Sequence, residues 1–574
     1  MRIRLLALLL CALSALPATA TGFLHADGIR IVDGEGRPVL LRGMGLGGWM
    51  IQEGYMLQLG QHQQHVIRRD IADIVGEDKA AAFYRAWLDN FITKPDVDAM
   101  ADWGFNAIRL PIHYDILTLP ADKEPKLGID TWHEEGFGRI DRLRDWARAN
   151  GIYLILDLHA TPGGQGSDLP IADRDPAKPS LWESVENRRK TVALWKKLAT
   201  RYADDPTIGA YDILNETNWD FSGPGGGHGC SETGNAPLRQ LLIEITAAIR
   251  SVDRRHMIVI EGNCWGNNYA GILPLWDDNL AISFHKYWNA NDEASIAAML
   301  KLRDEADAPL WLGETGENSD VWFRDVIRLV EDHDIGWSFW PLKKLGFNNP
   351  LEVVPNPGWA PLAAYLRGDK GAAKPSEAAA WAALSTLASH DIRFENDLQH
   401  PEVIDAMFRQ PHSAATLPFK PHRIGTGAAV IQAVDYDMGP TGIAYQDALD
   451  ADYHIVAGTG EVAGNSGRTY RNDGVDIALG KEGPYVSDFR DGEWMAYTLS
   501  AAKAGSRAIA VEASGSGTIT LSLNDGAPMR LVVKSGEWAR LRAPGFTFLE
   551  GNNRLVVGAV RCDCKLSRII VLPD

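Results

Sequence analysis

Residues 210–216 read AYDILNE, a short apolar run that ends on two polar side chains, Asn215 and Glu216. Similar runs recur between residues 39 and 340, separated by amphipathic segments of helical spacing. Continuous apolar character, in place of strict alternation, is typical of parallel strands buried on both faces. The runs begin at Val39, Asn106, Leu154, Ala210, Met257, Ile282, Pro309 and Ile335. Eight strands that alternate with helices predict an α/β fold of the (β/α)8 TIM-barrel type.

Polar residues gather at the carboxyl ends of these predicted strands. Such ends converge on one mouth of a barrel, so we expect the side chains to share one site. They are Arg109, His159, Asn215, Glu216, His285, Tyr287, Glu314 and Trp340. One glutamate there could simply be a salt-bridge partner. Two, on strands four and seven, fit the pair that glycosidic cleavage requires, one protonated and one ionised.

Two further acids lie close to this set. Glu317 follows Glu314 by three residues and lies past the expected strand end, so we interpret it as a loop carboxylate. Glu261 ends the fifth strand, where it is either structural or lines a subsite.

Composition and the amino-terminal residues indicate which partners and which compartment to expect for the protein. The chain has 574 residues and a formal net charge of −18, which argues against nucleic acid as a partner. Residues 1–20 combine Arg2 and Arg4, an apolar stretch and a small-residue cleavage pattern, and are predicted to be a signal peptide. We therefore expect a secreted or periplasmic protein that is not inserted in the membrane after cleavage, and a monomer.

Four cysteines follow the predicted signal peptide. In an oxidising compartment the first interpretation of such cysteines is disulfides. Cys230 and Cys264 fall in loops expected on one face of the barrel and are the favoured pair. Cys562 and Cys564 could form a local bridge or stay free. No HExxH or paired CxxC spacing is present, so we expect no metal and no cofactor in the barrel.

Six motifs carry a family resemblance. GFNAIRLP, LILDLHATPGGQ, DILNE, SFHKYW, LWLGETG and GWSFW, in that order, resemble glycoside hydrolase family 5 over about residues 23–370. The resemblance implies a retaining β-glycoside hydrolase with Glu216 as acid/base and Glu314 as nucleophile. It further implies substrate-site roles for Arg109, His159, Asn215, His285, Tyr287 and Trp340.

The substrate expected from this resemblance is a β-glucan polysaccharide or oligosaccharide. A β-mannanase, a xylanase or a transglycosylase on the same scaffold stays open, because strand-end residues do not specify the linkage. A non-catalytic polysaccharide-binding protein is the alternative from another class, and two paired carboxyl groups argue against it.

The carboxyl-terminal part changes pattern. Short alternating strands such as TITLSLND, with Ile519 and Leu521 on one face, predict an antiparallel sandwich. The predicted domains are a barrel over residues 21–390, an ordered connector over 391–429 and a β-sandwich over 430–574.

The strings IQAVDYD, YRNDGVDI, DGEWMAYTLS and LSLNDG resemble a family 6 carbohydrate-binding module of jelly-roll type. This resemblance implies that Tyr485 and Trp538 clamp a sugar at an accessory site. Gln432 and Val434 replace the glutamates that usually bind a structural calcium, which argues against that ion. Cys562, Asp563 and Cys564 replace the segment that often supplies a ligand-binding asparagine, so a purely structural domain stays open.

Overall fold

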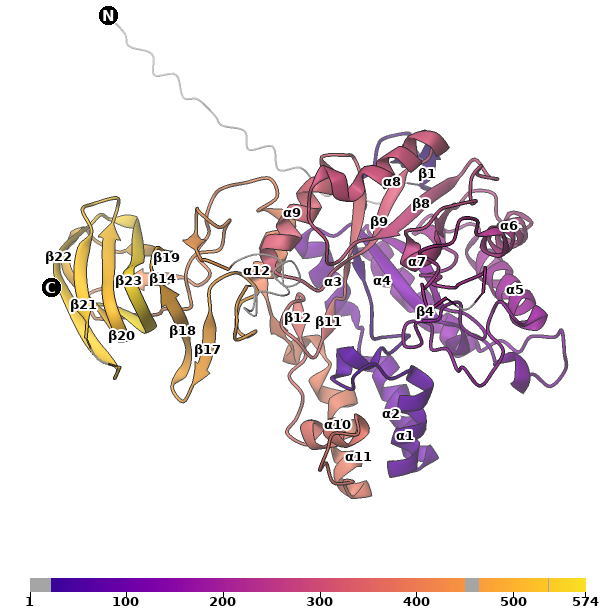
Figure 1. Cartoon of the computed structure of the whole chain (residues 1–574), viewed down its shortest axis with the longest axis horizontal. Coiled ribbons are helices and arrows are strands. Elements are labelled where there is room, and N and C mark those ends of the chain that lie inside the picture. The colour runs from indigo at the N-terminus through magenta and orange to yellow at the C-terminus, as the bar shows by residue number, and fades with distance from the viewer. Residues whose placement is uncertain (1–21, 224, 450–463, 535, 574) are drawn as a thin grey trace, which may run out of the picture.

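The computed structural model describes residues 22–223, 225–449, 464–534 and 536–573 (Figure 1). Residues 1–20, predicted to be a signal peptide, lie outside this part. Among the described residues, the helices are all too short or too polar to span a bilayer.

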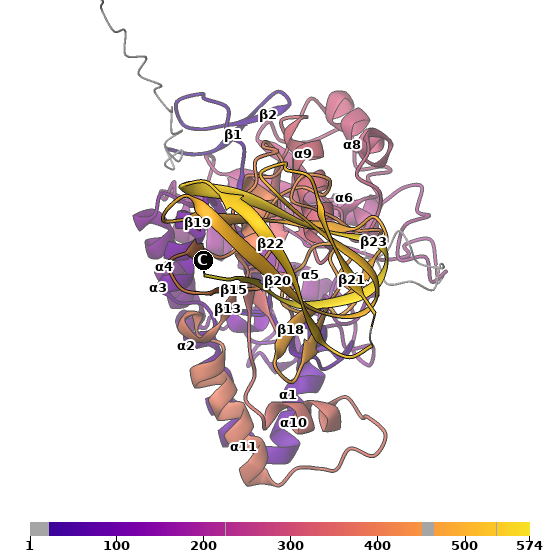
Figure 2. The ribbon, with the colours of Figure 1, turned by 90° about the vertical axis from the view of Figure 1, so that its left-hand side faces the viewer.

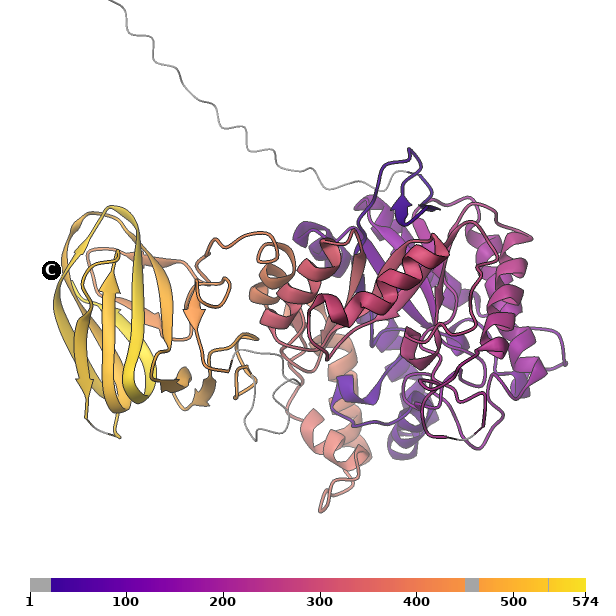
Figure 3. The same cartoon turned by 45° about the horizontal axis from the view of Figure 1, so that its top comes forward.

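A closed barrel of eight parallel strands forms the first domain, in the cyclic order β10-β3-β4-β5-β6-β7-β8-β9 (Figures 1 and 3). The strands are β3 (Arg42–Gly45), β4 (Ala107–His113), β5 (Tyr153–Ala160), β6 (Ile208–Asp212), β7 (Met257–Glu261), β8 (Leu280–His285), β9 (Leu310–Gly316) and β10 (Gly336–Trp340). The (β/α)8 prediction is confirmed. An antiparallel hairpin of β1 (His25–Asp27) and β2 (Arg30–Val32) precedes the barrel.

Inside the barrel, the strands change from apolar to charged along their length. Alternate residues of a strand share a face, and the inward residues near the strand starts form one apolar cluster. Its members include Ala107, Ile155, Ala210, Val259 and Ala281. Two residues further along each strand stand Arg109, Asp157, Asp212, Glu261 and Ser283. The apolar residues near the strand starts fill that end of the barrel, and the polar residues further along the strands form the floor of its mouth.

Helices surround the barrel and bury their apolar stripes against the outward faces of the strands. They are α3 (Lys94–Trp103), α4 (Glu134–Ala149), α5 (Val185–Tyr202), α6 (Ala236–Arg250), α8 (Glu293–Ala306) and α9 (Asp320–Glu331). In α6, Leu238, Leu242 and Ile245 are fully buried, as their spacing predicts. The Ser319 side chain accepts from the N–H of Trp322 and caps the start of α9.

A helical lobe lies beside the barrel (Figures 1 and 2). It contains α1 (Gln64–Val75), α2 (Glu77–Asn90), α10 (Trp359–Leu366) and α11 (Glu377–Thr386), which pack on one another. A small sheet of β11 (Lys343–Lys344), β12 (Leu351–Glu352) and β13 (Leu398–Gln399) follows the last barrel strand. The expected connector, residues 391–429, contains β13, α12 (Pro401–Phe408) and β14 (His422–Ile424), and α12 packs on α9.

The C-terminal domain is all β, with its own apolar core. After β14 come β15 (Ala429–Gln432), β16 (Tyr445–Gln446), β17 (Ile477–Gly480), β18 (Gly483–Arg490), β19 (Trp494–Ala501), β20 (Gly505–Leu523), β21 (Met529–Val533), β22 (Ala539–Phe548) and β23 (Gly551–Val571). The long strands β20 and β23 pair antiparallel and contribute to most of the sheet (Figure 2). Ile519 and Leu521 are buried on one face, as predicted, and Cys562 is bonded to Cys564.

The buried amine of Lys343 generates a stability prediction. Its Nζ lies 2.6 Å from Asp96 Oδ1 and 2.9 Å from Asp397 Oδ2, with no side-chain exposure for any of the three. Lys343→Met leaves two buried carboxylates without their cation. We therefore expect the free energy of unfolding, measured by urea denaturation, to fall by about 3–5 kcal/mol. Lys301→Met, which removes an exposed pair with Glu305, is the control and should leave it unchanged. Equal effects of the two substitutions would contradict the prediction.

Candidate active site

The guanidinium of Arg109 lies at the centre of the barrel mouth and is fully buried. Its Nε donates to Asp212 Oδ2 at 2.8 Å, and its Nη2 donates to Asn215 Oδ1 at 2.8 Å. Its Nη1 donates to Glu314 Oε1. Asp157 and Glu261 complete the shell at 3.2 and 3.1 Å. One cation therefore faces four carboxylates that come from four different strands.

Glu314, near the end of β9, is held by a second donor. The hydroxyl of Tyr287 donates to Glu314 Oε2 at 2.8 Å. Burial alone would raise the pKa of Glu314, but the positive charges of His285 and Arg109 outweigh it and hold that pKa below its usual value. The side chain is therefore kept as a carboxylate.

Glu216 has the opposite electrostatic setting. Burial, reinforced by the charges of Glu314 and Glu261, raises its pKa to about 7, although His285 opposes the shift. His285 Nδ1 lies 2.6 Å from Glu216 Oε1 and 3.6 Å from Glu314 Oε2. One carboxylate oxygen of each glutamate lies within 4.8 Å of the other. Two glutamates with oppositely shifted pKa values thus face each other across one gap.

The backbone around Glu216 differs from the expected strand. We predicted a strand through residue 216, but β6 ends at Asp212. Glu216 has a positive φ of 39°, and its N–H donates to Glu261 Oε2 at 2.7 Å instead of to the sheet. This strained turn points to a function, because a non-glycine residue adopts it only where its surroundings enforce it.

His159 and Trp340 pack on each other at the mouth. Their rings stack with centroids 5.3 Å apart and an interplanar angle of 4°. His159 Nδ1 lies 2.8 Å from Asp157 Oδ2, while burial lowers the pKa of the imidazole to about 3 and keeps it neutral. A Cβ on Gly47 would lie 2.6 Å from the Trp340 ring, so the loop after β3 needs glycine there.

Four polar residues of the mouth were missed from the sequence. Asp157 and Asp212 lie inside apolar strand segments. A charged residue within such a segment could have indicated that it belongs to the site. Glu53 Oε1 lies 4.0 Å from His159 Nε2, and burial, then the charge of Glu314, raises the pKa of Glu53 well above its usual value. Tyr55 accepts a hydrogen bond from Trp340 Nε1 at 3.0 Å. Both lie beyond the end of β3, where the strand-end rule gives no signal.

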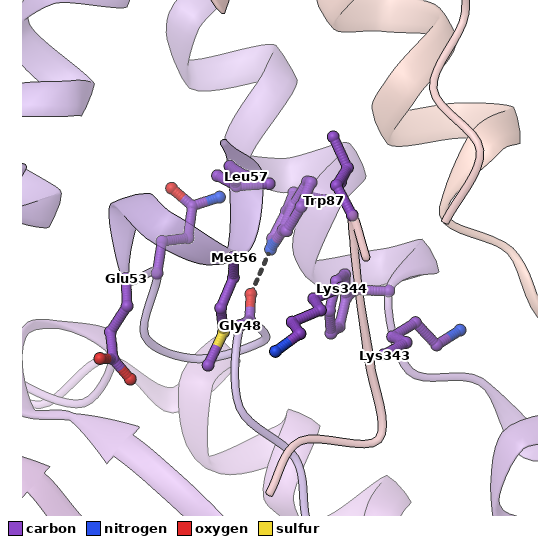
Figure 4. Close-up of a pocket in the computed structure, with 10 residues that line it drawn as sticks. Gly48, Glu53, Met56, Leu57, Trp87, Lys343 and Lys344 are labelled. Atoms are coloured by element: carbon purple, nitrogen blue, oxygen red, sulfur yellow. Dashed lines mark hydrogen bonds between the residues drawn. The ribbon is translucent and has the colours of Figure 1, made fainter. Parts of the chain in front are cut away.

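Figure 4 shows the surroundings of Glu53. Its carboxylate points away from the apolar side chains of Leu57 and Trp87. Lys343 and Lys344 extend in opposite directions, one into the core and the other towards the mouth. Lys344 Nζ donates to Glu317 Oε1 at 2.8 Å, so Glu317 is a paired loop carboxylate and lies outside the Arg109 cluster.

Glu261 is part of the ionic floor. It accepts from Arg109, and its Oε1 lies 3.2 Å from His285 Nε2. Burial would raise the pKa of Glu261, but His285 and then Arg109 lower it to about 2. Of the two interpretations made from the sequence, the structural one fits this placement.

Loops around the mouth are cross-linked. Cys230 is bonded to Cys264, the pair favoured from the sequence, which joins the loop after β6 to α7 (Asn263–Gly266).

In the C-terminal domain, Trp538 is 49% exposed, and its ring centroid lies 5.6 Å from that of Tyr485 at an edge-to-face angle of 85°.

The sequence of the barrel is similar to the sequences of known proteins. Residues 70–346 match the family model of cellulase, glycosyl hydrolase family 5. The chain is 28% identical over 371 residues to a β-xylosidase of Phanerodontia chrysosporium, covering 58% of this chain and 73% of that protein. It is 23% identical over 327 residues to endoglucanase C of Acetivibrio thermocellus, covering 46% and 88%. A probable glucan 1,3-β-glucosidase A of Aspergillus niger is 32% identical over 185 residues, covering 31% and 41%.

These sequence matches define the class of the barrel as a glycoside hydrolase. Residues 70–346 of the barrel are a glycoside hydrolase family 5 domain, and the protein is a β-glycoside hydrolase.

The two glutamates generate a titration prediction. We expect 13C NMR of labelled carboxyl groups to show Glu216 titrating near pH 7, with the signal identified by its loss in Glu216→Gln. In Glu314→Gln the pKa of Glu216 should fall, because the neighbouring negative charge is gone. Glu317→Gln is the matched control and should change the titration of Glu216 little. A Glu216 signal that titrates near pH 4.5 in the unsubstituted protein would contradict the assignment.

Proposed function

We propose that this glycoside hydrolase cleaves β-glucans by a retaining double displacement, with Glu314 as nucleophile and Glu216 as acid/base. The observation that carries the proposal is the pair of oppositely shifted carboxyl groups within 4.8 Å of each other. Carboxyl groups about 5–5.5 Å apart characterise retaining enzymes, whereas inverting enzymes need about 6.5–9.5 Å to admit a water.

The first step forms a covalent intermediate. A Glu314 oxygen attacks the anomeric carbon while the bond to the leaving oxygen breaks, and that oxygen takes the proton of Glu216. Arg109 and Tyr287 orient the nucleophile through hydrogen bonds to its two oxygens. Their donors also keep Glu314 ionised, which the attack requires.

The second step is hydrolysis of the glycosyl ester. Glu216, now a carboxylate, takes a proton from water, and the water oxygen displaces Glu314 from the anomeric carbon. Glu216 ends protonated and Glu314 ends ionised, as at the start. The scheme uses only side chains and water.

The choice of a β-glucan rests on the relatives, two of which bear the names endoglucanase and glucan 1,3-β-glucosidase. The name β-xylosidase of a third keeps xylan as the second candidate. Trp288, 56% exposed beside Tyr287, offers an aromatic face for a sugar ring.

We also propose that the protein is exported, which the Cys230–Cys264 and Cys562–Cys564 bridges support.

Substitution of the nucleophile tests this scheme. We expect Glu314→Gln to lower kcat on β-1,3- or β-1,4-glucan by roughly a thousandfold or more while the folded protein still binds the glucan. Glu317→Gln, the neighbouring loop carboxylate, is the control and should stay within about threefold of the unsubstituted enzyme. Proton NMR of the unsubstituted enzyme should show a β-anomeric first product.

Substitution of the acid/base completes the test. Glu216→Ala should be rescued by azide with formation of a β-glycosyl azide, because the small anion attacks the intermediate without a general base. An α-anomeric first product would contradict retention, and full turnover by Glu314→Gln would remove Glu314 from its role. Folded protein without activity on glucans, xylan or mannan would favour a binding protein.

We also propose that Trp538 contacts glucan chains at an accessory site in the C-terminal domain. Its edge-to-face contact with Tyr485 leaves the indole half exposed. We expect Trp538→Ala to weaken binding to soluble β-glucan by roughly tenfold in affinity electrophoresis, without changing hydrolysis of short oligosaccharides. Leu549→Ala, an exposed apolar residue of the same domain, is the control. Equal mobility of the two variants in glucan gels would contradict the site.

A further inference from the structure

The C-terminal domain touches the barrel next to the strand that bears Glu314. Figures 1 and 3 show α9 and α12 on the side of the barrel that faces this domain. Asn472 makes this contact, and we call residues 464–476, in which it lies, the Asn472 loop. Asn472, Asn318 and Ser319 are fully buried there.

Three hydrogen bonds join Asn472 to the segment between β9 and α9. Its Nδ2 donates to the carbonyl of Asn318 at 2.8 Å and to Asp320 Oδ1 at 2.9 Å. Its own carbonyl accepts from the N–H of Asp320 at 2.8 Å. Buried hydrogen bonds of this kind fix a segment, because breaking one leaves a desolvated polar group without a partner.

From the same segment a further contact runs to the proposed nucleophile. Asn318 Nδ2 donates to the carbonyl of Tyr287 at 3.2 Å, and its Oδ1 accepts from the N–H of Ser319 at 2.8 Å. The hydroxyl of Tyr287 in turn donates to Glu314 Oε2 at 2.8 Å. A continuous path therefore leads from Asn472 to Glu314, made of three hydrogen bonds and of the covalent structure of Asn318 and Tyr287 between them.

The Asn472 loop is itself rigidly held by its own domain. Arg471 is buried, and its guanidinium donates to the carbonyl of Tyr436 and to Asp473 Oδ2. Asn465 Nδ2 donates to the carbonyl of Arg471 at 2.8 Å. Because both neighbours of Asn472 are fixed to the sandwich, the loop transmits the position of that domain to the barrel.

We propose that Asn472 is a positioning residue for catalysis, by which the C-terminal domain holds Tyr287 against Glu314. The inference rests on the proposed role of Glu314 as nucleophile. It makes the C-terminal domain a structural part of the catalytic site, whether or not the domain also binds glucan.

The test is Asn472→Ala in the full chain. Alanine is chosen because aspartate would add a carboxylate close to Asp320, Asp473 and Glu402, which already repel one another. We expect kcat on an aryl β-glucoside to fall by about tenfold to a hundredfold, as for a displaced catalytic group, with KM changed less than threefold. We also expect the acid limb of the kcat/KM profile to move to higher pH, because a loosened Tyr287 no longer favours the ionised form of Glu314.

A matched control separates positioning from stability. Asn553 is buried in the same domain, and its Nδ2 donates to the carbonyls of Leu549 and Gly551, away from the barrel. Asn553→Ala should lower the thermal stability of the domain but leave kcat and the acid limb unchanged. An Asn472→Ala variant that is folded, by circular dichroism, and has the kcat and pH profile of the unsubstituted enzyme would overturn the proposal.

A second variant serves if Asn472→Ala does not fold. Asn318→Ala removes the amide that donates to the carbonyl of Tyr287 and accepts from the N–H of Ser319, and it adds no charge, so it should reproduce the loss of kcat and the shift of the acid limb. If both single variants fold, the kcat of the double variant should be no lower than that of the less active single variant, because the two residues act in one path. Additive losses, or an Asn318→Ala enzyme with unchanged kcat, would contradict the path.

The proposed nucleophile is checked separately. A 2-deoxy-2-fluoro-β-glucoside with a good leaving group should label Glu314 in the unsubstituted enzyme, as peptide mass spectrometry would show. Labelling of another residue defeats the proposed function. Labelling of Glu314 together with an unaltered Asn472→Ala enzyme defeats only the present inference.

Discussion

One buried cation, Arg109, organises the mouth of the barrel. Placing a charge out of water carries a penalty of several kcal/mol, which is offset only by well-oriented partners. Here the partners are Asp157, Asp212, Glu261 and Glu314, each from a different strand. The four acids depend on Arg109 in turn, since they could not be buried together without the guanidinium. The strands that supply them are consequently held in register at the end where the chemistry occurs.

The same cluster explains how two nearby glutamates differ. Glu314 contacts Arg109 directly and receives the Tyr287 hydroxyl, so its ionised form is stabilised. Glu216 has no contact of that kind with the guanidinium in the described structure and shares the charge of His285 with Glu261. Burial therefore dominates at Glu216 and is overcome at Glu314. A difference of partner, at nearly equal burial, separates the proposed proton donor from the proposed nucleophile.

Much of this could be predicted from the sequence, because strand periodicity and strand-end polarity are local signals. The runs that end at His159, Asn215 and Glu314 place their side chains at one mouth once the barrel is assumed. Glu53 and Tyr55 were missed because they lie beyond the end of β3 and reach the site only through the path of a loop. The left-handed turn at Glu216 was also missed, since it depends on a hydrogen bond to Glu261, which is remote in sequence. The bridge between Cys562 and Cys564 required coordinates to decide between two open alternatives.

The contact of Asn472 with Asn318 belongs to a different class of feature. The two residues are 154 positions apart, and nothing in the local pattern of either connects them. The sequence resemblance left open whether the C-terminal domain binds sugar or is purely structural. The buried hydrogen bonds at Asp320 favour a structural contribution, because a tethered module would leave the N-terminus of α9 exposed to water instead of covered. The proposed glucan contact at Trp538 and the proposed support of Tyr287 by Asn472 involve separate residues of one domain, so each can be removed by substitution without removing the other.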